Sequence, residues 1–134
     1  MIVVDTSVVV AGFASWHEGH AGALAALAEG PRLPAHVALE AYSVLTRLPP
    51  PHRATAGIVL SFIERRFPDA LLTLPASAHR RMLKDAAEAG ITGGALYDAL
   101  VAATARHAGG TLLTRDRRAT RTYEAIGADF RLIG

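Results

Sequence analysis

Residues 1–14 read MIVVDTSVVVAGFA, and this stretch decides the fold. The β-branched run Ile2–Val4 predicts a short buried strand, which ends at the acidic residue Asp5. Thr6 and Ser7 are good N-cap residues, so we expect a helix over residues 8–14. A strand that leads directly into a helix is the unit from which parallel sheets are built.

Strand-like and helix-like segments alternate along the rest of the chain. Helical periodicity, together with caps and breakers, predicts further helices over residues 18–28, 35–47, 54–66, 75–89, 95–107 and 117–126. Extended pieces or short apolar runs predict additional strands at residues 32–34, 70–74, 111–114 and 130–133. This alternation favours the α/β class, in which helices cover both faces of a parallel sheet. Ligands of such open sheets bind beyond the carboxyl ends of the strands.

The composition limits the classes of protein that are possible. A chain of 134 residues that is 51% hydrophobic can bury a core of its own, so we expect a single domain over residues 1–134. The absence of cysteine excludes disulfide bonds, cysteine-based zinc sites and thiol chemistry. No apolar segment approaches the roughly 20 residues that cross a bilayer, and the start of the chain does not resemble a secretion signal. We therefore expect a soluble, cytoplasmic protein without a membrane partner.

The basic residues are almost all arginine. Arginine accounts for every one of them except Lys84, although the formal net charge is only +2. A guanidinium group can donate two hydrogen bonds at once to a phosphate, which would suit a nucleic-acid substrate. A genome whose base composition favours arginine and alanine codons explains the same bias, so charge alone does not decide between these explanations.

Two acidic residues follow predicted strands. Asp5 ends the first strand, and Asp116 lies two residues beyond the strand at residues 111–114. Because the carboxyl ends of parallel strands meet at one edge of a sheet, we expect both acids at the same edge.

Two further acids interrupt apolar helix faces. Glu40 lies three residues after Val37 and four before Val44, on the inward face of its helix. Asp98 has only apolar neighbours three and four positions away, among them Val101. Carboxylates that converge out of water repel each other, which raises their pKa values unless a cation compensates. Hard oxygen ligands of this kind select Mg²⁺ or Mn²⁺.

Each acid also has a structural explanation that remains open at this point. Asp5 could cap the first helix, and Asp116 could cap the helix at residues 117–126. Glu40 could pair with an arginine such as Arg47, and Asp98 could cap a helix or form a salt bridge.

Four segments of the sequence resemble the VapC toxins of bacterial type II toxin–antitoxin pairs, which are PIN-domain ribonucleases. These segments are VVDTS (residues 3–7), ALEAYSVLTRLPP (38–50), LYDALVAATA (96–105) and LTRDRR (113–118). The resemblance spans nearly the whole chain, and the second and third segments are specific in their order and spacing.

The resemblance implies a PIN-like three-layer α/β/α sandwich with a central parallel sheet. It also implies an Mg²⁺-dependent endoribonuclease, with Mn²⁺ as a substitute ion, that forms a homodimer and is inhibited by a VapB-type antitoxin. The residues that it assigns to the metal site are Asp5, Glu40, Asp98 and Asp116, supported by the hydroxyls of Thr6, Ser7 and Thr114.

The hypothesis for the mechanism is hydrolysis of RNA by a metal-activated water molecule. Asp5, Asp98 and Asp116 would hold the metal, and Glu40 would orient or deprotonate the water. Some relatives carry a further acid shortly after the position of Asp116, where this chain has Arg-Arg-Ala-Thr at residues 117–120. The number of metal ions therefore stays open.

Three arginines around the last acid, Arg115, Arg117 and Arg118, are candidates for contact with the RNA backbone. A solvated helix face is the alternative for them.

Two other functions would also place acids at strand ends. A Mg²⁺-dependent phosphatase or phospho-acceptor domain is the first, although its nucleophile type would need an aspartate at the position of Ser7. A non-catalytic antitoxin-binding module is the second, and intact acids at all four positions count against it.

Overall fold

The computed structural model describes the whole chain, residues 1–134. Its centre is a parallel sheet of three short strands, β1 (Ile2–Val4), β2 (Thr111–Thr114) and β3 (Phe130–Leu132), in the order β1-β2-β3. The register pairs Ile2 with Thr111 and Leu112 with Phe130. All three strands point the same way, so the residues that follow β1 and β2 leave the sheet at the same edge.

The predicted strands at residues 32–34 and 70–74 are only isolated bridges beside β1. Val3 pairs with Arg32, and Pro34 pairs with Leu72. Both pairings are parallel and extend the sheet by one residue at a time. The ring nitrogens of Pro31 and Pro34 cannot donate hydrogen bonds, so this segment cannot continue as a regular strand.

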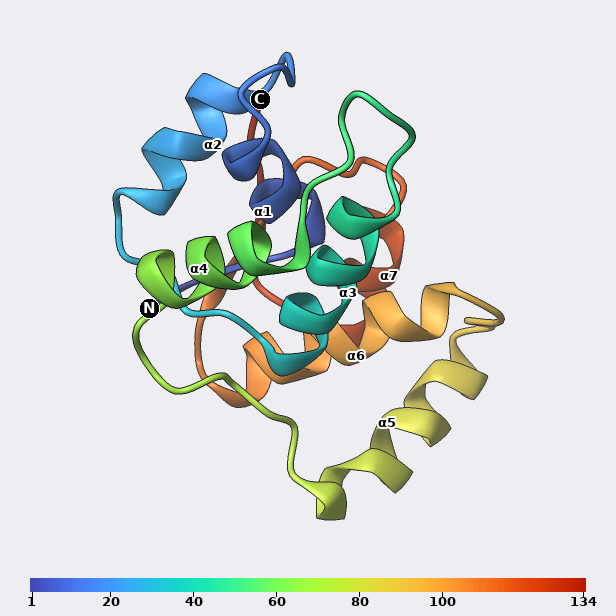
Figure 1. Cartoon of the computed structure of the whole chain (residues 1–134). Helices are drawn as coiled ribbons and strands as arrows, with labels where there is room; N and C mark the ends of the chain where they lie inside the picture. The colour runs from blue at the N-terminus through green and yellow to red at the C-terminus, as the bar shows by residue number, and fades with distance from the viewer.

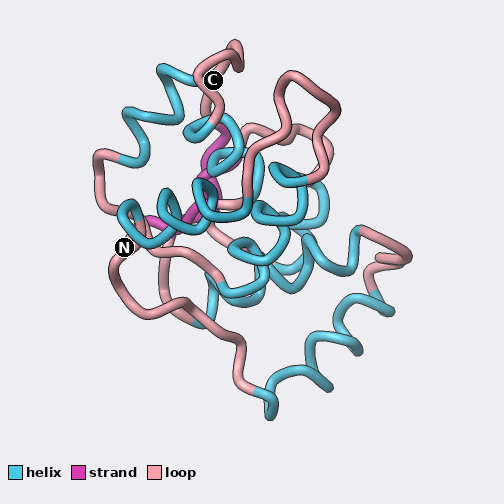
Figure 2. Tube along the Cα trace, in the orientation of Figure 1, coloured by secondary structure: helices cyan, strands magenta, loops and turns pink.

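Seven helices surround the sheet, and each corresponds to a helix predicted from the sequence. They are α1 (Thr6–Phe13), α2 (His20–Leu27), α3 (Ala35–Thr46), α4 (Ala56–Arg66), α5 (Ala76–Glu88), α6 (Ala95–His107) and α7 (Thr120–Ile126). The strands lie inside the molecule with helices around them (Figure 2). α5 stands apart from the rest of the molecule, next to α6 (Figure 1). None of the helices has the length and apolar character needed to span a membrane.

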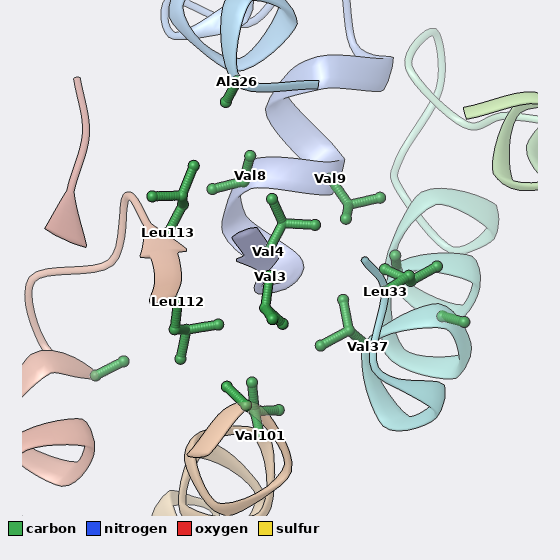
Figure 3. Packing of buried hydrophobic residues seen from close by; sticks show 14 of the residues in the cluster. Val3, Val4, Val8, Val9, Ala26, Leu33, Val37, Val101, Leu112 and Leu113 are labelled. Atoms are coloured by element: carbon green, nitrogen blue, oxygen red, sulfur yellow. The ribbon is translucent and has the colours of Figure 1, made fainter. Parts of the chain in front are cut away.

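Alternate residues of the strands point to opposite layers of helices. Val4 and Leu113 point toward α1 and α2, whereas Val3 and Leu112 point toward Val101 of α6 (Figure 3). All five side chains are buried in one continuous hydrophobic core. The arrangement confirms the predicted α/β class, with a central parallel sheet between helical layers.

Several helices begin one to three residues away from the predicted start, and the starts of α1 and α7 matter for the acids. α1 begins at Thr6, because the side chain of Asp5 caps it by accepting a hydrogen bond from the backbone nitrogen of Val8 at 3.3 Å. α7 begins at Thr120 and not at residue 117. The segment before it forms a turn, in which Asp116 accepts a hydrogen bond from the backbone nitrogen of Arg118. Such local side-chain bonds compete with helix formation.

Gly12 and Gly22 provide a matched test of the packing between α1 and α2. A Cβ atom at Gly12 would lie 2.5 Å from Cδ1 of the buried Leu27, whereas one at Gly22 would meet nothing within 4 Å. We expect Gly12→Ala to lower the free energy of unfolding by about 1 kcal/mol, because overpacking outweighs the better helix propensity of alanine.

Gly22→Ala is the control and should raise the free energy of unfolding by roughly 0.5 kcal/mol, since alanine improves helix propensity there without a clash. Urea unfolding measures both changes. A Gly12→Ala protein as stable as the Gly22→Ala protein would contradict the close approach of the two helices.

Candidate metal centre

A small cavity opens at the carboxyl ends of β1 and β2. It has a volume of about 40 Å³. This volume is enough for a single ion, or alternatively for about two to three water molecules. Its lining comes from the start of α1, from α3, α6 and α7, and from the segment after β2: Asp5, Thr6, Ser7, Glu40, Asp98, Val101, Asp116 and Tyr123. The structure thus brings the four acids that were singled out from the sequence around one cavity.

Parallel pairing of the strands explains why these acids meet. Asp5 directly follows β1, and Asp116 follows β2, which pairs with β1 in parallel. Glu40 reaches the same edge from α3, and Asp98 reaches it from the first turn of α6. The helices α3 and α6 are in contact with each other, which places Glu40 and Asp98 beside the strand ends (Figure 1).

Asp5 is the most buried of the four acids, with 4% of its surface exposed. Its Oδ1 accepts hydrogen bonds from the hydroxyl of Ser7 and from the backbone nitrogen of Val8. Its Oδ2 accepts one from the hydroxyl of Tyr123 at 2.8 Å. Burial raises the pKa of Asp5 above its ordinary value, although the donors that surround the carboxylate oppose this increase.

Tyr123 is a site residue that the sequence analysis missed. It lies on α7, 118 positions after Asp5, and its side chain is 1% exposed. Burial raises its pKa, and the negative charge of Asp5 raises it further, so the hydroxyl keeps its proton and donates. A buried tyrosine normally has a partner for its hydroxyl, but the sequence does not show which residue that is.

Asp98 has no hydrogen-bonding or ion-pairing partner among the side chains, although water reaches part of it. Burial raises the pKa of Asp98 to about 6, and repulsion from Asp116, Glu40 and Asp5 adds to the increase, while His36 lowers it. Mutual repulsion among the acids was expected from their placement in the sequence. The structure shows that repulsion at Asp98, with burial as the larger cause.

Glu40 and Asp116 have local partners. Oε2 of Glu40 lies 3.5 Å from Nε2 of His36, one turn earlier in α3, so its neighbour is this histidine and not Arg47. Oδ1 of Asp116 accepts a hydrogen bond from the backbone nitrogen of Arg118 at 2.9 Å. Asp5 therefore caps α1, as one of the alternatives proposed, whereas Asp116 stabilises the turn before α7 and does not cap that helix. Both residues line the cavity as well.

The hydroxyls of Ser7 and Thr114 connect the ends of β1 and β2. The Ser7 hydroxyl donates to Asp5, accepts from the backbone nitrogen of Arg115 at 2.8 Å, and lies 3.5 Å from Oγ1 of Thr114. Thr114 in turn accepts from the backbone nitrogen of Asp116 at 3.0 Å. This chain of contacts holds the two acids in a fixed relation. The hydroxyl of Thr6 is buried at the cavity and has no hydrogen-bonding partner.

None of the three arginines near Asp116 lines the cavity. The guanidinium group of Arg115 packs so closely against Gly19 and Gly134 that a side chain at either glycine would overlap it. Arg117 and Arg118 are exposed on the surface.

The chemistry of the donors suits a small divalent cation. Four carboxylates and the unpartnered hydroxyl of Thr6 offer only hard oxygen atoms, as Mg²⁺ or Mn²⁺ requires. As the side chains stand, no three of the acids are grouped closely enough to hold an ion together. Asp5 and Asp116 are held by hydrogen bonds, and Glu40 lies beside His36.

Comparison with known proteins identifies relatives of the whole chain. A family model described as the PIN domain matches residues 2–125. The chain is 51% identical over 133 residues to Ribonuclease VapC40 of Mycobacterium tuberculosis, with 99% of each chain covered. It is 40% identical over 127 residues to Ribonuclease VapC27 of the same species, with 94% of this chain and 92% of the relative covered.

Solved structures share the fold. The crystal structure of FitAcB from Neisseria gonorrhoeae matches with a TM-score of 0.70 at 20% identity, over 97% of this chain and 96% of that one. The structure of FitAB bound to an IR36 DNA fragment matches with a TM-score of 0.73 at 20% identity, over 98% of this chain and 94% of that one. Together, the family match and the full-length identity to named ribonucleases show that the chain belongs to the PIN-domain family, among its VapC toxin ribonucleases.

Proposed function

We propose that this VapC ribonuclease is a Mg²⁺-dependent endoribonuclease that uses Asp5, Glu40, Asp98 and Asp116 as its metal centre, with Mn²⁺ as a substitute ion. The observation that carries the proposal is the meeting of four carboxylates around one cavity of about 40 Å³. Their charges are uncompensated at Asp98, where the pKa is raised to about 6. A divalent cation would remove this repulsion and shift the pKa back.

We assign each of the four acids a role according to its surroundings in the cavity. Asp5, Asp98 and Asp116 are the proposed ligands, and Asp98 and Glu40 must rotate toward the ion because the acids are not yet grouped around one point. When bound, the cation supplies neutralising charge for the scissile phosphate and lowers the pKa of water. Glu40, at the partly exposed rim, is placed to orient the attacking water or take its proton at a carboxylate oxygen.

The hydroxyl residues support this centre. Ser7 and Thr114 hold Asp5 and Asp116 in place, and the free hydroxyl of Thr6 can bind a water molecule beside the acids. Arg117 and Arg118 remain our candidates for contact with the RNA backbone. Arg115 would first have to leave its packing against Gly19 and Gly134.

We further propose a homodimer and inhibition by a VapB-type antitoxin, with the single domain of residues 1–134 acting in the cytoplasm on RNA. Exposed apolar side chains support contact with other chains: Leu39 is 72% exposed, and Ile58 is 59% exposed. An apolar groove runs between α3 and α4 and is lined by Leu39, Tyr42 and Leu60 among others. Patches of this kind are typical of protein interfaces.

Membership among the VapC ribonucleases decides against the phosphatase, the phospho-acceptor domain and the non-catalytic module.

Asp98→Asn is the sharpest test of the metal centre, because Asp98 has no structural partner to lose. We expect RNA cleavage in Mg²⁺ to fall by more than about a hundredfold, since a neutral amide cannot replace a charged ligand. Asp85→Asn is the matched control on α5, where the carboxylate pairs with Arg81 outside the cavity, and it should cleave at the wild-type rate. Wild-type cleavage by the Asp98→Asn protein would rule out the proposed centre.

The same variant should stabilise the metal-free protein. The pKa of Asp98 is about 6 in the folded protein against 3.8 as the ordinary value, so the folded state binds more protons between these pH values. The free energy of unfolding therefore falls as the pH rises through this range. Asp98→Asn removes the free-energy cost of the ionised carboxylate in the folded state. The variant should therefore be more stable than the wild type at pH 7.5, by on the order of 1 kcal/mol after allowance for the water around the carboxylate.

Urea unfolding in the presence of a chelator measures this difference. It should shrink toward zero as the pH is lowered toward 3.8, where the wild-type carboxyl is also largely neutral. An Asp98→Asn protein no more stable than the wild type at pH 7.5 would show that the charge of Asp98 is already compensated.

Tyr123→Phe tests whether the tyrosine positions Asp5. The change removes only the hydroxyl that donates to Oδ2 of Asp5 at 2.8 Å and keeps the ring that packs against Phe130. The Mg²⁺ concentration for half-maximal cleavage should rise about tenfold, because supporting hydrogen bonds orient the ligand. Tyr42→Phe removes a hydroxyl that does not line the acidic cavity and is the control. An unchanged Mg²⁺ dependence in Tyr123→Phe would exclude a positioning role.

A further inference from the structure

An ordered pair of aromatic rings lies beside the acidic cavity. The ring of Tyr97 stacks on the imidazole of His36, with 5.3 Å between the ring centroids and 7° between the planes. Tyr97 directly precedes Asp98 in α6, and His36 lies one turn before Glu40 in α3. Nε2 of His36 is also 3.5 Å from Oε2 of Glu40. The pair therefore bridges the two helices that carry Glu40 and Asp98.

Packing between α3 and α6 does not account for the exposure of this tyrosine. Tyr97 is 54% exposed, whereas the tyrosine that packs inside the molecule, Tyr123, is 1% exposed. His36 covers Tyr97 by parallel stacking, and about half of the tyrosine remains open to solvent. An aromatic ring that is held in place and still exposed offers a flat surface to another ring.

The charges of the cavity make such a surface useful for RNA binding. The cavity is lined by four carboxylates and by neither arginine nor lysine, so its own residues repel the phosphates of the substrate. Base stacking on an aromatic side chain needs no positive charge and tolerates every base. Bases available for stacking occur in single-stranded segments and not inside a duplex.

We propose that Tyr97, backed by His36, stacks against an unpaired base next to the scissile phosphate and holds single-stranded RNA across the acidic cavity. This inference rests on the proposed function, because it takes the cavity as the place of cleavage. Tyr97 is then a substrate-binding residue whose contact is with the base, while the acids act on the phosphate.

Substitutions of Tyr97 separate the aromatic face from the hydroxyl and from simple packing. Tyr97→Leu keeps an apolar side chain but removes the flat ring, and it should raise KM for a single-stranded RNA roughly five- to a hundredfold. Tyr97→Phe and Tyr97→Trp keep the ring and should stay within about twofold of the wild type. Trp16→Leu is the control: it removes another exposed ring that packs on a histidine, His52, outside the lining of the acidic cavity, and it should leave KM unchanged.

A second measurement reports stacking without cleavage. An RNA oligonucleotide that contains 2-aminopurine loses fluorescence when the modified base stacks on an aromatic ring. The Asp98→Asn protein in Mg²⁺ should quench this fluorescence, and the Asp98→Asn, Tyr97→Leu double variant should quench it far less. Duplex RNA of the same sequence should give little quenching with either protein.

The outcomes distinguish this inference from the proposed function. The stacking would be overturned if Tyr97→Leu and the wild type had equal KM values. It would also be overturned if Tyr97→Leu and Tyr97→Phe raised KM by the same factor. Unchanged RNA affinity in Tyr97→Leu together with lost binding of a protein partner would overturn it as well and assign Tyr97 to a protein interface. A wild-type protein that cleaves no RNA would refute the proposed function, and the quenching comparison would still decide the stacking.

Discussion

The parallel pairing of β1 with β2 is the constraint on which the rest of this structure depends. It joins residues from opposite ends of the chain, since Ile2 pairs with Thr111. Parallel strands need crossover connections, so the chain between them must form helices that cover the sheet. The same pairing brings Asp5 and Asp116 to one edge, where Ser7 and Thr114 connect them through their hydroxyls. The pairing of β1 with β2 therefore determines both the fold and the position of the acidic site.

The four acids are stabilised unequally, and this inequality reflects the chemistry of the site. Asp5 is surrounded by donors from Ser7, Val8 and Tyr123, so its carboxylate stays fixed despite its burial. Asp98 has no donor, and its charge is opposed by burial and by the other three acids. Carboxyl groups with perturbed pKa values cluster at functional sites. A bound cation would offset both the burial of this charge and the repulsion from the other acids.

The sequence predicted which segments form helices more accurately than it predicted the residues at which the helices begin. The bounds of α6 were predicted without error, because its alanine-rich periodicity lies between glycine pairs. The start of α1 was misplaced, since Asp5 and not Thr6 or Ser7 caps it, and such choices depend on local hydrogen bonds. Strand ends singled out Asp5 and Asp116, and helical periodicity singled out Glu40 and Asp98. Periodicity placed Glu40 on an inward face, although its side chain is 42% exposed. The roles of the four acids as metal ligands remain predictions.

Residues whose partners lie far away in the sequence could not be predicted. Tyr123 looks like any core residue of a short helix, and only the folded structure shows that its hydroxyl reaches Asp5. Its position has a consequence for the order in which the protein is made. Asp5 leaves the ribosome 118 residues before Tyr123, and β2 and Asp116 also follow it only after six helices. Domains fold as units during synthesis. A nascent chain that stops before these segments has no complete site, so the activity cannot appear until β2, Asp116 and Tyr123 have all been made.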